Sequence, residues 1–179
     1  FLEALETLAE KAGVKLERQR GDTPEAKLKE RMLEAHHLAA EYYHYILFSH
    51  PLGEKARAYL SSRGVSDKTA KTYMIGYSPN SWDSLIRYLR KKGYDEKLLS
   101  HAGLTVPSAR GGYDRFRGRL MFALRDHRGR TIGFSGRLLD PEVKEAKYIN
   151  SPETPIYTKG HMLFGLDVAK PSIQRENTA

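Results

Sequence analysis

Arginine, whose side chain is well suited to binding phosphate, is concentrated in one stretch of this sequence. Residues 113–137 contain seven arginines and two aspartates, so they contribute +5 to a formal net charge of +8 for all 179 residues. The planar guanidinium group binds two phosphate oxygens at once and stacks on nucleobases, which the lysine ammonium group cannot do. The stretch therefore predicts contact with a polyanion. The alternative is a hairpin whose scattered surface charges are only solvated.

The first half of this stretch has the alternation of a β-strand. Arg115, Arg117 and Arg119 are separated by single residues. Side chains of an extended strand change faces at every residue, so these three arginines are expected to share one face. Leu120–Leu124 is an unbroken apolar run, which is typical of a buried strand.

The second half predicts a turn and a returning strand. Asp126–Gly129 has turn chemistry, because aspartate bonds its own backbone and glycine accepts a positive φ. We expect Thr131–Leu138 to be the strand, with Ile132, Phe134 and Leu138 on one face and Thr131, Gly133, Ser135 and Arg137 on the other. Because glycine and serine are small, a polymer backbone is expected to approach the second face closely, with Arg137 at its edge.

A short segment after these strands combines three groups that suit nucleic acid. Lys147 supplies a cation, Tyr148 an aromatic ring and Asn150 an amide that can read a base edge. Stacking of a base on an aromatic side chain contributes ~1–3 kcal/mol and tolerates any sequence. Tyr148 and Asn150 are expected to share a face of an extended segment. The alternative is a strand whose tyrosine packs in the core.

No self-sufficient catalytic or metal site is expected in the chain. It has no cysteine, which excludes disulfides, thiolate zinc sites and cysteine nucleophiles within it. His36 and His37 are adjacent, so on a helix they point about 100° apart and cannot share a metal; His44 has no second ligand four residues later. We expect these histidines to be core or surface residues.

The first half of the chain is predicted to be helical and the second half to be rich in strands. This arrangement is typical of the α+β class. We expect a helix over Phe1–Ala12, a linker over Lys15–Asp22, and a long helix capped by Thr23 that reaches Phe48 with its last turns buried all round. Shorter helices are expected over 54–62, 66–74, 82–92, capped by Ser81, and 95–101. Residues 76–79 are interpreted as a link, strands begin near Tyr113, and 156–166 is expected to add a strand edge or hairpin.

Length and composition fit a globular chain of one domain or two small ones. No apolar run approaches the roughly 20 residues of a membrane span, and the positive charge favours nucleic acid over a membrane surface. The chain does not begin with methionine and starts within a helical pattern, so we expect it to be a piece of a longer protein.

Several blocks together resemble the bacterial DNA primase family (DnaG type). The blocks occur in order along almost the whole chain, at 1–13, 59–82, 113–122, 133–137, 147–154 and 157–166. The resemblance implies that residues 1–22 lead in from a zinc-binding domain and that 23–179 form the amino-terminal subdomain of the RNA polymerase core. The TOPRIM subdomain of that core, which holds Mg²⁺ or Mn²⁺, would be absent, as would the Zn²⁺ domain, so this piece would bind no cofactor.

The same resemblance implies the function and its residues. Primases of this type synthesise RNA primers on a single-stranded DNA template from ribonucleoside triphosphates, and a carboxy-terminal domain binds the replicative helicase. This piece would lack catalytic residues, be inactive alone and act in the cytoplasm at the replisome, with no membrane partner. By resemblance, the template groove is lined by Arg115, Arg117, Arg137, Lys147, Tyr148 and Asn150, and Arg63 and Lys159 face that site or the nucleotides.

Two other functions stay open at this point. The chain could be a scaffold that docks the zinc and TOPRIM domains, with its basic residues matched to their acidic surfaces. It could also be a general basic module unrelated to priming, which would bind duplex and single strands equally. Arg119, Arg128 and Arg130 are further candidates from charge alone, and the last two are expected to be exposed at the turn.

Overall fold

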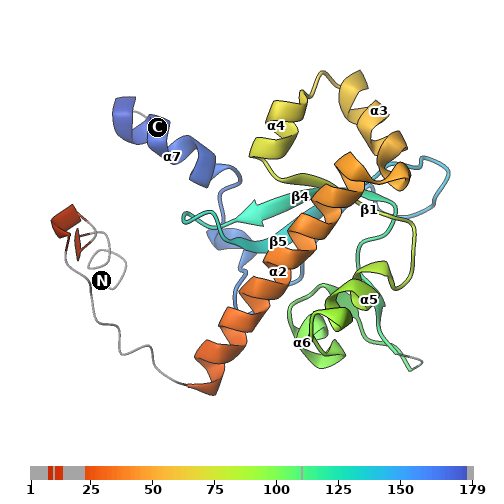
Figure 1. The fold of residues 1–179 in the computed structure, drawn as a ribbon, viewed down its shortest axis with the longest axis horizontal. Helices are drawn as coiled ribbons and strands as arrows, with labels where there is room; N and C mark the ends of the chain where they lie inside the picture. The colour runs from red at the N-terminus through yellow and green to blue at the C-terminus, as the bar shows by residue number, and fades with distance from the viewer. Residues whose placement is uncertain (1–7, 10, 14–22, 110, 177–179) are drawn as a thin grey trace.

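The computed structural model describes residues 8, 9, 11–13, 23–109 and 111–176. A four-stranded antiparallel sheet in the order β1-β4-β5-β6 is covered on one face by the long helix α2 (Pro24–Ser49) (Figure 1). Its strands are β1 (Ile75–Ser78), β4 (Arg119–Arg125), β5 (Thr131–Leu138) and β6 (Tyr148–Asn150). A second sheet pairs β2 (Thr105–Val106) with β3 (Tyr113–Asp114). The α+β prediction is confirmed.

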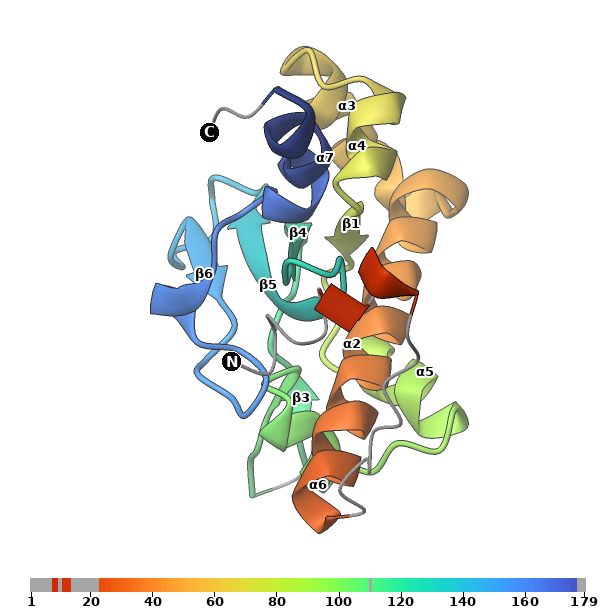
Figure 2. The ribbon, with the colours of Figure 1, turned by 90° about the vertical axis from the view of Figure 1, so that its left-hand side faces the viewer.

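Helices α3 and α4 lie beyond the carboxyl end of α2, α5 and α6 pack along its side, and α7 lies beyond the sheet (Figures 1 and 2). Their bounds are α3 (Glu54–Ser62), α4 (Asp67–Thr72), α5 (Ser84–Lys91), α6 (Glu96–His101) and α7 (Leu166–Glu176), with 3₁₀ turns at Pro51–Gly53 and Lys159–His161. Of the expected first helix, residues 8, 9, 11 and 12 are described and helical; its other residues and the expected linker lie outside the described part. No helix in the described ranges has the length and apolar character needed to cross a membrane.

Helix α2 is the element on which the sheet is built. Thr23 caps it by accepting a hydrogen bond from the Ala26 amide at 3.2 Å, as predicted. Strand β1 approaches it so closely that a Cβ on Gly76 would lie 2.6 Å from the Tyr43 carbonyl carbon. The expected burial all round the last turns is wrong at one position, because Tyr45 is 55% exposed.

The short helices follow their sequence signals except at α5. Ser66 and Asp95 cap α4 and α6 by accepting from the amides of Thr69 and Leu98. Helix α5 begins at Ser84, later than expected, and Ser81 is not its cap. Its first amides are held instead by Asp114, whose carboxylate accepts from Leu85 and Ile86 at 2.8 and 3.0 Å. Because the cap comes from a residue some thirty positions later, local sequence could not show it.

Three predictions about extended segments need correction. Residues 76–79 are not merely a link, because Ile75–Ser78 forms the edge strand β1. Four residues that include a glycine are too short a segment for strand alternation to be recognised in the sequence. Segment 156–166 adds only an isolated Thr154–Tyr157 bridge and a 3₁₀ turn before α7 begins. Strands also begin before Tyr113, at β1 and β2. The turn and β5 are confirmed with the predicted bounds.

The two faces of the four-stranded sheet have different neighbours. The inner face, with Met121, Ala123 and Phe134, packs against α2 in the main core. The outer face carries Ile75 and Leu120, which pack under α3 and α4 in a second cluster. Arg137 pairs with Leu120 and Tyr148, and by strand alternation all three lie on this outer face, with Arg137 at the edge of α3.

Candidate nucleic-acid interface

One cluster of predicted residues lies on the outer face where α3 meets β5. The Arg137 guanidinium lies 4.3 Å from the centre of the Tyr59 ring, and Arg63 donates from Nε to the Tyr59 hydroxyl at 3.0 Å. The pKa of Arg63 is raised, mainly by this hydrogen bond and more weakly by Tyr148, so Tyr148 is also close. Tyr59 thus brings together arginines that are 74 positions apart in the sequence, and we call Tyr59, Arg63, Arg137 and Tyr148 the outer cluster.

Strand β6 places its residues beside this cluster. Tyr148 pairs with Arg137 and Asn150 pairs with Ser135 across the β5–β6 ladder. Tyr148 is 55% exposed, so its ring is not in the core, and the core alternative is wrong. Lys147 and Asn150 are exposed as well. The predicted cation, ring and amide are therefore all available to a ligand.

Lys159 lies beyond Asn150 on the same side. Its side chain is exposed in the 3₁₀ turn, and its backbone amide donates to Glu153 at 3.0 Å. Together with Ser135, Asn150 and Phe164 it lines a shallow cavity of about 360 Å³ on the outer face. The structure thus places Arg63, Arg137, Tyr148, Asn150 and Lys159 on the outer face. Lys147 directly precedes β6 and, by strand alternation, projects to the opposite side with Ile149.

A second group forms around Arg117, at the ends of β1 and β5. The Arg117 guanidinium lies 4.3 Å from the Trp82 ring centre and 5.2 Å from that of Tyr113. It donates to the Asp114 carbonyl at 2.8 Å and lies 3.6 Å from Glu145. Trp82 is 64% exposed, which makes this an accessible aromatic and cationic surface. We call Trp82, Tyr113 and Arg117 the second stack.

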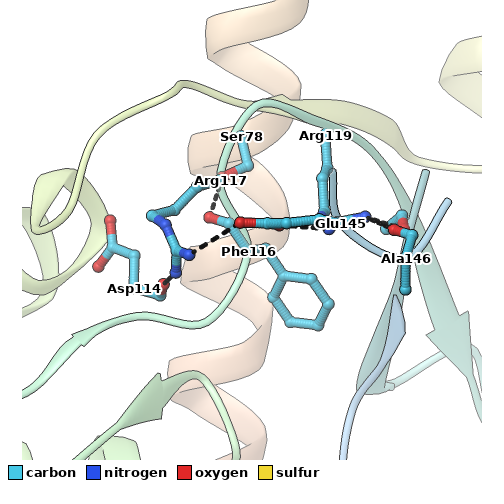
Figure 3. A network of polar contacts seen from close by, with 8 residues as sticks. Ser78, Asp114, Phe116, Arg117, Arg119, Glu145 and Ala146 are labelled. Atoms are coloured by element: carbon cyan, nitrogen blue, oxygen red, sulfur yellow. Dashed lines mark hydrogen bonds and ion pairs between the residues drawn. The ribbon is translucent and has the colours of Figure 1, made fainter. Parts of the chain in front are cut away.

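Arg119 is not part of any surface, and the prediction that Arg115, Arg117 and Arg119 share one strand face is wrong. The strand stops at Asp114 and resumes at Arg119, so the alternation is broken between them. Figure 3 shows Arg119 reaching the 145–146 segment, where it donates to the Ala146 carbonyl and to Glu145, each at 2.8 Å. Its side chain is 1% exposed.

Arg115 occupies an intermediate position. Its amide donates to the Leu104 carbonyl at 3.1 Å, which ties the 115–118 turn to the segment after α6. Burial lowers the pKa of its side chain below the usual arginine value. Among the described residues its Nε has no hydrogen-bond partner. Arg115 is therefore half-buried, as is Arg117, whose side chain is 17% exposed.

The face of β5 with small side chains, which was predicted to let a polymer backbone approach closely, is only partly open. A Cβ on Gly133 would lie 3.2 Å from the Ser151 side chain and 3.4 Å from the Tyr157 ring, so this end is filled by the chain itself. Ser151 accepts a hydrogen bond from the Phe134 amide at 2.9 Å, which fixes the covering segment. The face is open only toward Ser135 and Arg137, where both residues are half-buried.

The histidines are structural, as expected. His36 is fully buried, stacks on Phe134 with ring centres 5.7 Å apart, and bonds through Nδ1 to the Met32 carbonyl at 2.8 Å. Burial lowers its pKa to about 4. His44 bonds to the Ile75 carbonyl on β1 at 2.8 Å. Within the described ranges, no three His, Cys, Asp or Glu side chains are grouped so as to hold a metal ion.

Sequence reasoning missed the aromatic partners of the arginines. Tyr59 precedes Arg63 by four residues on α3, a spacing that brings side chains together on a helix, so this pair could have been found. The rings of Trp82 and Tyr113 lie edge to face with centres 5.3 Å apart, and the hydrogen bond from the Asp114 amide to the Trp82 carbonyl joins their two segments. No local pattern indicates that contact.

Comparison with known proteins agrees with this architecture. Residues 42–170 match the family model of the DNA primase catalytic core, N-terminal domain. A DNA primase of Streptomyces coelicolor is 41% identical over 182 residues, which covers 100% of this chain and 28% of that protein. One of Geobacillus stearothermophilus is 39% identical and covers 100% of this chain and 31% of its own length.

Solved structures show the same fold. The RNA polymerase domain of Mycobacterium tuberculosis primase DnaG superimposes with a TM-score of 0.78 at 37% identity, covering 82% of this chain and 48% of that one. A DnaG primase catalytic domain bound to ssDNA superimposes with a TM-score of 0.74 at 38% identity, covering 82% and 45%. The chain belongs to the family of the amino-terminal domain of the DNA primase catalytic core. It spans under a third of the length of the curated relatives named above.

Proposed function

We propose that this chain is the amino-terminal subdomain of a primase RNA polymerase core and that it binds the single-stranded DNA template. The template contacts are Arg63, Arg117, Arg137, Lys147, Tyr148, Asn150 and Lys159, with Arg115 as a partly buried neighbour. The observation that carries the proposal is the outer cluster, in which Tyr59 holds two arginines beside exposed Tyr148. Phosphates can bind the guanidinium groups while a base stacks on the tyrosine.

Related structures support the choice of nucleic acid. One relative of this fold is a primase catalytic domain bound to ssDNA, and another is a Mycobacterium tuberculosis primase domain with a duplex that has a 6-nucleotide overhang. Both the outer cluster and the second stack combine arginine with exposed aromatic rings, Tyr148 and Trp82. Single strands expose bases that can reach the rings.

The whole primase is a nucleotidyltransferase, and this chain would supply template binding to it. The divalent ions that stabilise charge during phosphodiester formation, and the structural Zn²⁺, would be held by parts outside the described residues. Ribonucleoside triphosphates and the replicative helicase would likewise meet the whole enzyme in the cytoplasm, and this chain alone would synthesise no primer.

Binding of the 179-residue chain to a fluorescent single strand and to a duplex of the same sequence, at two salt concentrations, tests the proposal. We expect the single strand to bind more tightly and its affinity to fall steeply with salt, because bound cations release counterions from the strand. No binding by a folded chain would favour the scaffold that docks neighbouring domains. Equal affinity for duplex and single strand would favour a general basic module.

A further inference from the structure

A cavity lies between the outer cluster and the second stack. It has a volume of about 470 Å³, within the range of roughly 300–1,000 Å³ that holds small-molecule ligands. Tyr59 and Arg117 line it, so each of the two cation–aromatic groups contributes a wall. A single strand that contacts both groups must therefore pass over the mouth of this cavity.

The walls of the cavity suit a flat heterocycle. Tyr77, Leu138 and Leu139 supply apolar and aromatic surface. Tyr77 is half-buried on β1, and Arg137 donates to the Leu138 carbonyl at 3.3 Å, which joins the cavity wall to the outer cluster. An unstacked base buries its faces against such side chains in many single-strand complexes.

The charges around the cavity argue against phosphate as its occupant. Lys55 and Arg117 are balanced there by Asp140 and Glu145, and Glu145 also holds buried Arg119 at 2.8 Å. The outer cluster, in contrast, contains two arginines and no carboxylate. A phosphate should therefore bind the outer cluster in preference to the cavity. The cavity has no net charge and is suited to an uncharged group.

We propose that the cavity receives one unstacked base of the template while a neighbouring phosphate binds the outer cluster and the strand continues past the exposed Trp82 ring of the second stack. This inference rests on the template-binding function proposed above and adds to it a point of base recognition. Asn80 stands at the mouth, packed over Gly118 at 3.7 Å from the position of an added Cβ, and offers both a donor and an acceptor.

The polar groups of the cavity select among the bases. The carboxylate of Asp140 accepts hydrogen bonds, and together with the Asn80 amide it favours a base whose edge carries an exocyclic amino group. Cytosine has this group and thymine has a carbonyl oxygen in its place. The cavity should thus discriminate between two pyrimidines of nearly the same size.

Competition binding of short oligonucleotides to the 179-residue chain tests the inference. Three probes are compared: a thymine tract, the same tract with one central cytosine, and the same tract with one central abasic site. We expect the cytosine probe to bind about tenfold more tightly than the thymine tract, the size of one good base contact, and the abasic probe to bind most weakly. Asp140→Ala should bring the cytosine-to-thymine ratio close to one, and Asn80→Ala should lower it in part.

A further variant of the same cavity distinguishes loss of base recognition from loss of folding. Val143 lines the cavity and is 38% exposed, so Val143→Trp fills the space from a position that tolerates a larger side chain. It should also remove the cytosine preference, whereas Lys97→Ala on α6 should leave it unchanged. Equal binding of all three probes with normal salt dependence would overturn the base cavity but not template binding. Absence of binding to every probe would overturn both.

Discussion

The two faces of the four-stranded sheet each carry an arginine, and the two arginines have opposite surroundings. Arg119 lies on the inner side, where its Cδ is 3.1 Å from the position of a Cβ on Gly136, and it is fully enclosed by backbone carbonyls and Glu145. Arg137 lies on the outer side and stacks on Tyr59 with no carboxylate. An arginine-rich stretch thus contains both structural and contact residues, and the segments that pack over each side of the sheet decide which is which.

The largest effect should come from removing the inner arginine. Arg119→Ala leaves the Ala146 carbonyl without its donor and Glu145 without its close partner. We expect a loss of about 3–4 kcal/mol in the free energy of unfolding, because two hydrogen bonds from a charged group are lost, while Glu145, which is 45% exposed, is hydrated again. Urea denaturation measures it. Arg137→Ala is the matched control and should cost less than about 1 kcal/mol; equal costs would contradict the comparison.

The contribution of the inner face to the free energy of unfolding should also depend on pH, whereas that of the outer face should not. The pKa of buried His36 is about 4, against an ordinary value of 6.5. Between these values the unfolded chain takes up a proton that the folded chain does not. The contribution of His36 to the free energy of unfolding is therefore fully present above pH 6.5. It is lost as the pH falls toward 4, by about 3 kcal/mol in total.

Urea denaturation at pH 7 and at pH 4.5 checks this expectation. His36→Gln cannot titrate, so the difference in unfolding free energy between wild type and variant should shrink as the pH falls. Other groups change both proteins equally and cancel in that difference. A difference that is the same at the two pH values would show that His36 titrates normally in the folded chain.

The outer face should show its importance in binding instead of stability. Arg137→Ala on this face, and Lys147→Ala at the exposed edge beside it, should each weaken binding of a single-stranded oligonucleotide by about 1.5 kcal/mol, the value of a hydrogen bond to a charged group. Each should also lower the salt slope by about one, because one fewer counterion is released. Fluorescence anisotropy measures both, with Lys97→Ala on α6 as the control. A fall in affinity with an unchanged slope would indicate that the phosphate contact is absent.

A smaller effect is expected from Tyr148, which tests base stacking separately from charge. Tyr148→Ala should weaken binding by about 1 kcal/mol without changing the salt slope, because stacking releases no counterions. Tyr148→Phe keeps the ring and should bind as wild type does. If the phenylalanine variant is as weak as the alanine variant, the hydroxyl and not the ring makes the contact.

Much of this architecture was predictable because its signals are local. Thr23, Ser66 and Asp95 cap the helices that follow them, and strand β5 has the bounds that its alternation predicts. The Lys147–Asn150 segment is exposed beside Arg137, as a binding segment must be. These features depend on a few neighbouring residues.

The errors occur where distant residues decide the outcome. Asp114 was counted among the charges of a strand, but its carboxylate caps α5 across the fold. Arg119 has the same local pattern as Arg117 and is buried only because the 145–146 segment folds over it. Gly133 was expected to leave an open face, which Tyr157 fills. Tertiary contacts of this kind have no periodicity in the sequence.

An NMR titration of the 179-residue chain with a short single-stranded DNA at two salt concentrations tests the central claim most directly. We predict salt-sensitive shifts at Arg63, Arg137 and the Tyr148–Asn150 segment, and unchanged resonances for buried Arg119 and for α6. Shifts at Arg119 that match those at Arg137, or none on the outer face of a folded chain, would contradict the division between a structural inner face and a template-binding outer face.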